Sequence, residues 1–279
     1  MRTLKCMMAY RGTKYHGFQR QDNAHTVQEA VEQALGSVLN HPVTIYGCSR
    51  TDTGVHARQY CFSFQTERPI QPLNLVRGVN GRLPDDISLL SAEDAAPSFH
   101  ARYACRGKEY LYLIHNSESP NPFLRDLACH HRRPIDPALL QACADRFIGT
   151  HDFKSFCSAQ AQRTSTVRTI YDFSVEMSGD SIILLVKGDG FLYNMIRILV
   201  GTMLQVNDGK LKLSDLDGIL AARDRRCAGK TAMACGLYLN RVFYDDAYQT
   251  EPKKGLRIVK KGDGAGTRSG MDPVKYYGD

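Results

Sequence analysis

The sequence lacks the apolar segments that mark membrane and secreted proteins. No apolar run approaches the roughly 18 residues needed to span a bilayer. Residues 1–5 lead directly into a strand pattern, without the apolar core of a signal peptide. With 43% hydrophobic and 23% charged residues, the composition of the 279-residue chain is that of a soluble globular protein. We therefore expect a cytoplasmic protein that makes no use of a membrane.

The cysteines also lack the spacing of a disulfide framework or a structural zinc site. Their number, nine, is odd, and no pair follows the CxxC pattern. Cys129-His130-His131 is the only cysteine–histidine cluster in the sequence. Neighbouring residues on a strand point to opposite faces, so these side chains are poorly placed to bind one metal ion. The sequence predicts reduced cysteines used as small core residues, and no metal.

Positive charge exceeds negative charge by a modest margin. The net charge is +7 and the isoelectric point is near 8.9, which favours a polyanionic partner. From residue 247 onward, seven Lys/Arg against four Asp/Glu give +3, so +4 remains for the preceding 246 residues. The overall charge is thus consistent with nucleic acid as a partner but does not identify it.

Hydrophobic periodicity predicts an α+β protein. Strands and helices follow one another without the regular alternation of a parallel sheet. Thr26, with Glu29 three residues later, and Asp136, followed by Pro137, are typical of helix N-termini. Helices are expected over residues 26–39, 73–83, 137–147 and 193–206 and from Ser214; strands are expected over 4–10, 43–46, 59–64, 87–92, 105–115, 169–175, 182–186 and 236–244.

The predicted elements fall into two units and a tail. Residues 1–100 form an N-terminal α+β half, and residues 101–246 form a C-terminal α+β half. We expect two related halves with mixed or antiparallel sheets, joined around a central cleft. Residues 247–279 are polar, basic and glycine-rich, which predicts a disordered tail able to add non-specific phosphate contacts.

The segment Ser49–Ala57 carries an acid beside a permanent cation. Strand patterns precede and follow it, so Asp52 is expected on a connection between two strands, where a rigid scaffold presents it to a ligand. Arg50, two residues away, can keep that carboxylate ionised. An oriented, ionised carboxylate is what nucleophilic or base chemistry requires.

This segment resembles the GRTDxGVHA signature of the tRNA pseudouridine synthase A family, in which the aspartate is catalytic. Ser49 and Thr53 replace the usual Gly and Ala. Other stretches resemble family motifs in the expected order, over roughly residues 4–245: the opening loop 10–21, the FHAR block 99–102, the KxYxY strand 108–112, the GxGFlxxMvR block 188–197 and a closing block 229–237 that lacks the usual proline.

The resemblance implies a pseudouridine synthase fold and the isomerisation of uridine to pseudouridine in the anticodon arm of tRNA, at positions 38–40. It further implies a homodimer that uses neither metal nor organic cofactor. Asp52 would be the nucleophile or base, with Arg50 and Arg197 keeping it anionic. Tyr110 would lie against the target base. The other residues expected to bind substrate are Arg11, Lys14, Gln19, Gln21, His56, Arg102 and Phe191.

Two other functions remain open from the residues alone. A non-catalytic RNA-binding module would use Tyr110 and Tyr112 as a stacking platform, but it leaves the Arg50–Asp52 pair without a purpose. A metal-dependent nuclease needs clustered carboxylates, and Asp52 has no acidic neighbour in the sequence. Arg197, on an apolar helix, needs an anion, either Asp52 or a structural partner elsewhere.

Overall fold

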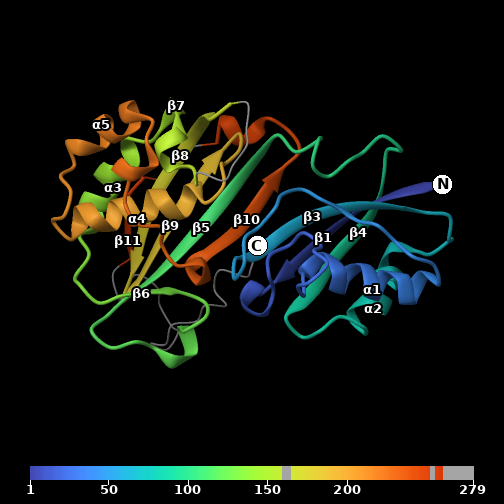
Figure 1. Ribbon diagram of the computed structural model, residues 1–279. Coiled ribbons are helices and arrows are strands. Elements are labelled where there is room, and N and C mark those ends of the chain that lie inside the picture. The colour runs from blue at the N-terminus through green and yellow to red at the C-terminus, as the bar shows by residue number, and fades with distance from the viewer. Residues whose placement is uncertain (159–164, 252–254, 260–279) are drawn as a thin grey trace.

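A computed structural model describes residues 1–158, 165–251 and 255–259. These residues form one long twisted sheet with helices packed along it, as Figure 1 shows, which confirms the α+β prediction. The longer strands are β1 (Arg2–Tyr10), β3 (His56–Thr66), β4 (Ile87–Ala95), β5 (Gly107–Asn116), β8 (Val167–Ser178), β9 (Ser181–Gly188) and β10 (Leu237–Phe243). The shorter ones are β2 (Tyr46–Gly47), β6 (Cys129–His131), β7 (Gly149–Asp152) and β11 (Arg257–Val259).

The two parts of the sheet join along a parallel pair of strands. The strand order is β11-β8-β9-β5-β10-β3-β1-β4, so β10 and β3 form the junction (Figure 1). Their register is short, with Tyr238 opposite His56 and Leu239 opposite Ala57. Because the two strands run in the same direction, the segments that lead into them, residues 48–55 and 229–236, lie at the same edge of the sheet. This edge carries the candidate site.

The helices are α1 (Val27–Leu39), α2 (Pro72–Asn80), α3 (Pro137–Asp145), α4 (Met195–Asn207) and α5 (Asp215–Ala222). Both predicted N-caps are present: Thr26 Oγ1 accepts from the Glu29 N–H at 3.3 Å, and Asp136 Oδ1 accepts from the Ala138 N–H at 2.9 Å. The helix from Ser214 differs, because Ser214 makes no capping bond. Asp215 Oδ2 instead accepts from the Lys212 N–H at 2.8 Å.

One predicted strand is shorter than expected. Residues 43–45 lie outside the sheet, and β2 covers only Tyr46–Gly47. The Ile45 N–H donates to Glu32 Oε1 of helix α1 at 3.0 Å instead of to a neighbouring strand. A side chain from the preceding helix thus takes the hydrogen bond that the β-branched sequence was expected to give to the sheet.

Helix α4 is buried almost all round, as its apolar sequence predicted. Gly201 allows the segment after α5 to pass directly against it, since a Cβ there would lie 1.7 Å from the Lys230 carbonyl oxygen. This contact fixes the 229–236 segment to α4 and therefore to the junction edge. Among the described residues, no helix combines the length and apolarity that a membrane crossing requires.

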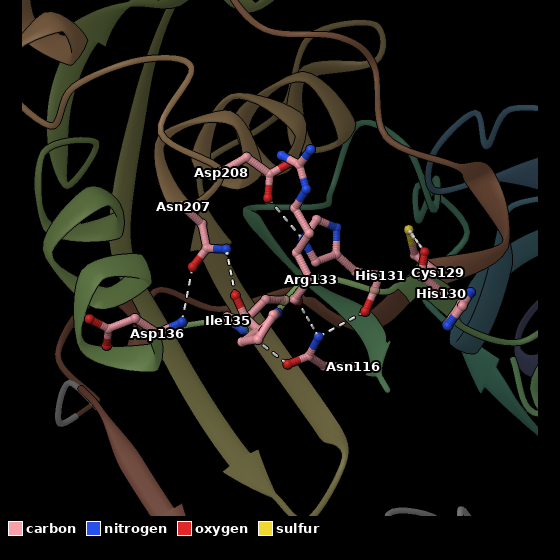
Figure 2. Close-up of polar contacts among 10 residues, drawn as sticks. Asn116, Cys129, His130, His131, Arg133, Ile135, Asp136, Asn207 and Asp208 are labelled. Atoms are coloured by element: carbon pink, nitrogen blue, oxygen red, sulfur yellow. Dashed lines mark hydrogen bonds and ion pairs between the residues drawn. The ribbon is translucent and has the colours of Figure 1, made fainter. Parts of the chain in front are cut away.

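The cysteine–histidine cluster of β6 is held by hydrogen bonds to neighbouring elements of the fold. Figure 2 shows His131 turned toward the end of α4 and His130 turned away from it. His131 Nε2 lies 3.1 Å from Asp208 Oδ1, and Asn116 Nδ2 donates to the His131 carbonyl at 2.8 Å. The cluster thus ties β6 to β5 and to the C-terminus of α4.

The region predicted as a tail begins with packed residues. Tyr248 is buried, stacks on Phe243 with ring centroids 5.0 Å apart, and lies against Gly107. Lys187 Nζ donates to Glu251 Oε2 at 2.5 Å, and β11 pairs in parallel with β8. These contacts were not expected of a disordered tail. The rest of that prediction falls on residues 252–254 and 260–279, which lie outside the described residues.

Candidate active site

Asp52 lies on the loop between β2 and β3, as the sequence predicted, and the residues before it are held from several sides. Tyr10 Oη and Thr51 Oγ1 are 2.8 Å apart, and the Thr51 carbonyl accepts from the Phe18 N–H at 3.2 Å. The Tyr60 hydroxyl donates to the Ser49 carbonyl. Three separate segments therefore fix the backbone that carries the carboxylate, which limits its reorganisation during a reaction.

The opening loop of the chain packs directly on the Asp52 loop, and glycines make this approach possible. A Cβ on Gly12 would lie 2.0 Å from the Val55 carbonyl oxygen. Gly17 has a φ of +87°, and a Cβ there would lie 2.6 Å from the Thr51 carbonyl oxygen. Both positions need glycine because a side chain there would clash with the neighbouring backbone, and Gly17 needs it also because of its positive φ. The two motifs separated in the sequence are thus one structural unit.

The Asp52 carboxylate is partly buried and has a close cation, Arg197. Its side chain is 24% exposed, and its Oδ2 lies 3.8 Å from Arg197 Nη1. Burial raises the pKa of Asp52 above its usual value, and the charge of Arg197 lowers it again by a smaller amount. A carboxylate with a raised pKa is a stronger base and nucleophile than an exposed one, provided that the cation keeps it ionised at neutral pH.

Arg197 is held in place by its own hydrogen bonds. Its Nε donates to the Ala232 carbonyl at 2.8 Å, and its Nη1 donates to Asn194 Oδ1 at 2.9 Å. Asn194 has a φ of 60°, a left-handed conformation that asparagine tolerates. The guanidinium is therefore aimed at Asp52 by α4 and by the 229–236 segment together. Asn194 was not singled out in the sequence, although it lies within the motif that contains Arg197.

Arg50 occupies a different place from the one expected. It is exposed and lines the same cleft as Asp52. Within the described part of the chain, no ion pair links Arg50 to Asp52, whereas Arg197 makes one. Nearness in the sequence favoured Arg50, but the turn directs its side chain toward solvent. Arg50 therefore contributes its charge to the lining of the cleft and not to an ion pair with Asp52.

Asp52 opens into a large cleft with an aromatic wall. The cleft has a volume of about 1440 Å³, more than the roughly 300–1,000 Å³ of small-molecule sites. Tyr110 and Phe191 form one wall, edge to face with ring centroids 5.3 Å apart. The Tyr110 hydroxyl lies 3.4 Å from Ser49 Oγ, and burial raises the pKa of Tyr110, so the hydroxyl keeps its proton. No bond between Tyr110 and Asp52 is found among the described residues.

The charged residues of the cleft lining are mainly basic. Its charged residues are Arg20, Arg50, Arg102, Lys108 and Arg168 against Asp52 and Asp189. Of the residues expected to bind substrate, Tyr110, Gln19, Gln21, Arg102 and Phe191 line this cleft. Arg11 and Lys14 do not belong to its lining; both are exposed, and Lys14 Nζ lies 3.8 Å from Asp86 Oδ2. A basic cleft of this size suits a polyanion better than a small molecule.

His56, expected to bind substrate, lies in the interior instead. Its side chain is fully buried at the β10–β3 junction, where its ring lies 4.6 Å from that of Tyr238. Nδ1 accepts from the Gly12 N–H at 3.0 Å, so Nε2 carries the proton and donates to the Cys235 carbonyl at 3.2 Å. Burial lowers the pKa of His56 to about 4. His56 thus joins the two halves and is not placed to contact RNA.

The buried neutral His56 makes the stability of the fold depend on pH. Its folded pKa, about 4, lies below the ordinary value of 6.5, so the unfolded chain binds an extra proton between these values. Its contribution is complete above pH 6.5 and is lost as pH falls toward 4. We expect a loss of about 2 kcal/mol between pH 6.5 and 5. In His56→Gln the melting temperature should be lower at pH 7 but should fall less from pH 7 to 5.

The matched control for this measurement is His16→Gln, because His16 is exposed. It should keep the pH dependence of the unmutated protein. Equal pH dependence in His56→Gln and the unmutated protein would contradict the assignment of His56 as the buried proton-sensitive group.

Comparison with known proteins matches both halves of this chain to one family. The family model described as tRNA pseudouridine synthase matches residues 6–104 and 143–245, one stretch in each half of the sheet. The tRNA pseudouridine synthase A of Ruminiclostridium cellulolyticum is 44% identical over 245 residues, which cover 88% of this chain and all of that protein. Those of Acetivibrio thermocellus (42% over 244 residues) and Brevibacillus brevis (44% over 245 residues) cover the same shares.

A solved structure of a Cbf5-Nop10-Gar1 complex contains a chain that aligns with 91% of this chain and 52% of its own length, at 14% identity and a TM-score of 0.37. That likeness is too low to carry an argument. The sequence matches are much stronger, since they extend across both halves and through the Asp52 loop. The chain therefore belongs to the tRNA pseudouridine synthase A family, a family of isomerases.

Proposed function

We propose that this chain isomerises uridine to pseudouridine at positions 38–40 of the anticodon arm of tRNA, with Asp52 as the nucleophile or base. The observation that carries the proposal is the pairing of Asp52 and Arg197 at 3.8 Å in a basic cleft with an aromatic wall. The named relatives support the reaction class and the tRNA substrate. The positions within the tRNA rest on the family resemblance alone.

The reaction needs no co-reactant. The C1′–N1 bond of uridine breaks, the uracil turns, and a C1′–C5 bond forms; one proton leaves C5 and one is gained by N1. Asp52 allows the glycosidic bond to break, by attack on the ribose, by attack on the ring, or by removal of a sugar proton. Each of these routes requires the ionised carboxylate, which is the form that Arg197 favours. No metal or organic cofactor enters the proposal.

The target base must leave its stack to reach Asp52. In the proposed complex it lies against the ring of Tyr110, with Phe191 packed at a right angle to that ring, and this contact replaces part of the stacking that the base loses. The cleft lining supplies Arg102, Gln19 and Gln21, which would bind phosphates and base edges. Arg11 and Lys14, outside the cleft, would meet the RNA backbone further along. Arg50 would bind a phosphate at the entrance.

Two further properties belong to this proposal: a cytoplasmic location, inferred from the sequence composition, and a homodimer, inferred from the family resemblance. Light scattering of the purified chain at micromolar concentration, with and without tRNA, measures the second directly. One protein chain per particle, both without tRNA and in the complex with tRNA, would remove the homodimer from the proposal.

The proposed activity has a direct test. Unmodified tRNA transcripts are incubated with the protein, and pseudouridine is mapped at single-nucleotide resolution. We expect product at positions 38–40 of tRNAs that carry uridine there, and none in transcripts with cytidine at those positions. Product elsewhere in the tRNA would support the proposed reaction and correct the proposed target positions. The absence of product at any uridine would reject both the reaction and the target.

A further inference from the structure

Three aromatic rings form a row in the lining of the cleft. The ring centroids of Tyr46 and His100 are 4.9 Å apart, and those of His100 and Tyr103 are 4.3 Å apart. All three residues line the same cleft as Asp52. Tyr46 is 49% exposed, and Tyr103 is 78% exposed. We call this row, Tyr46–His100–Tyr103, the aromatic ladder.

The ladder stands on a fixed base. Ala101, between His100 and Arg102, is fully buried; its N–H donates to Ser63 Oγ at 3.1 Å, and its carbonyl accepts from the Tyr244 hydroxyl at 2.9 Å. The Arg102 N–H donates to His100 Nδ1 at 3.2 Å, which sets the orientation of the imidazole. His100 and Tyr103 are therefore presented by an anchored turn and not by a loose loop, and Tyr46 is presented by strand β2.

The fold itself gives these rings little reason to be there. A tyrosine as exposed as Tyr103 buries almost no apolar area, so it contributes little to folding. Within the described residues, the hydroxyls of Tyr46 and Tyr103 have no hydrogen-bond partner. A row of exposed rings that continues a substrate cleft is the arrangement that proteins use to stack unpaired bases.

We infer that the aromatic ladder binds an unpaired nucleotide next to the target uridine, with the base stacked on the exposed face of Tyr103. This inference rests on the proposed function, because it takes the cleft as the place where tRNA is bound. Arg50 and Arg102, which line the same cleft, can receive phosphates of the bound strand. The base must be unpaired and splayed out, since the faces of bases within a duplex are covered by their neighbours.

An RNA base fits this surface better than a protein side chain does. The ladder lines the same cleft as Arg20, Arg50, Arg102, Lys108 and Arg168, so cations outnumber the two carboxylates of the lining, Asp52 and Asp189. The ladder also differs from the Tyr110–Phe191 wall, which lies beside Asp52 and faces the target base. The ladder would therefore contribute to binding and positioning of the tRNA and not to the chemical step.

The test compares Tyr103→Ala, Tyr103→Phe and Phe123→Ala with the unmutated enzyme on one unmodified tRNA. Phe123 is the matched control: it is 87% exposed, and it is not among the residues that line the cleft. Removing one stacking ring should weaken tRNA binding and raise KM by about 10-fold, with kcat within about twofold under saturating tRNA. Tyr103→Phe should restore binding, and Phe123→Ala should change neither constant.

A second readout observes the stacking itself. With 2-aminopurine placed at single unpaired positions of the anticodon loop, binding should quench fluorescence at one of them, and Tyr103→Ala should remove that quenching. Unchanged tRNA binding and quenching in Tyr103→Ala would overturn the inference. So would a change of oligomeric state in Tyr103→Ala with unchanged RNA binding, which would make the ladder a protein contact.

These outcomes are independent of the proposed target positions. If mapping places pseudouridine outside positions 38–40, the proposed function is corrected, but binding and quenching can still be measured on the same tRNA. If mapping succeeds and Tyr103→Ala behaves as the unmutated enzyme, only the ladder inference fails.

Discussion

Replacing Asp52 with asparagine should abolish pseudouridine formation while tRNA binding persists. Asparagine keeps the size of the side chain and the backbone contacts of the loop, but its amide is neither a nucleophile nor a base at neutral pH. Loss of such a group costs at least about 10⁴-fold in kcat. Single-turnover assays with excess enzyme measure the rate of product formation, and filter binding measures the Kd for tRNA, which should change by no more than about threefold.

Asp86→Asn is the matched control for this variant. Asp86 is also a poorly exposed carboxylate with a cation 3.8 Å away, Lys14, but it lies outside the cleft. Its replacement removes the same charge and should leave kcat within a few-fold. Turnover by Asp52→Asn at a tenth of the normal rate or more would reject Asp52 as the reacting group. Product formation by the unmutated protein, together with tight binding but no product in Asp52→Asn, would exclude the pure RNA-binding module.

Replacing Arg197 with glutamine should both slow the reaction and move its pH dependence. The guanidinium is the close cation that lowers the pKa of Asp52 against the effect of burial. Without it the pKa rises further, so a larger fraction of Asp52 is protonated and inactive at a given pH. The rate falls as pH falls through this pKa, and that acid limb should therefore move to higher pH. We expect kcat at neutral pH to fall by about 10²-fold.

The pH–rate profile separates the two arginines near the acid. Arg197→Lys keeps a positive charge but loses the planar hydrogen-bonding geometry, so its acid limb should lie closer to that of the unmutated enzyme. Arg50→Gln should weaken tRNA binding and leave the acid limb in place, because Arg50 is exposed and Arg197 makes the ion pair. A shifted limb in Arg50→Gln with an unshifted one in Arg197→Gln would reverse the assignment.

The features predicted well from the sequence are those determined by nearby residues. The N-caps of α1 and α3 depend on hydrogen bonds within three residues, and both were found where the pattern placed them. The position of Asp52 between two strands was likewise a local property. The apolar sequence of α4 predicted its burial, and the cost of burying Arg197 without an anion pointed to Asp52 as its partner.

The features that were missed depend on residues far apart in the chain. His56 looked like a binding residue because it follows the acid in the motif, but its surroundings are Gly12 and Cys235, contributed by two distant segments. Residues 43–45 were missed for a reason nearer in the chain: the Ile45 N–H donates to the side chain of Glu32, in the preceding helix, instead of to a neighbouring strand. Arg50 and Arg197 could not be ranked because the direction of a loop side chain is not encoded in spacing.

The division of the charge pair between the two halves bears on how folding of this protein should be measured. Asp52 precedes β3 and Arg197 is fixed by the segment that precedes β10, and those strands meet at only two residue pairs. A molecule whose junction had slipped by one residue would keep nearly all of its secondary structure, so circular dichroism would score it as native. A turnover measurement would detect the slip, because the carboxylate of Asp52 and the guanidinium of Arg197 would no longer meet. Specific activity is therefore a stricter criterion of correct assembly than any measurement of helix and strand content.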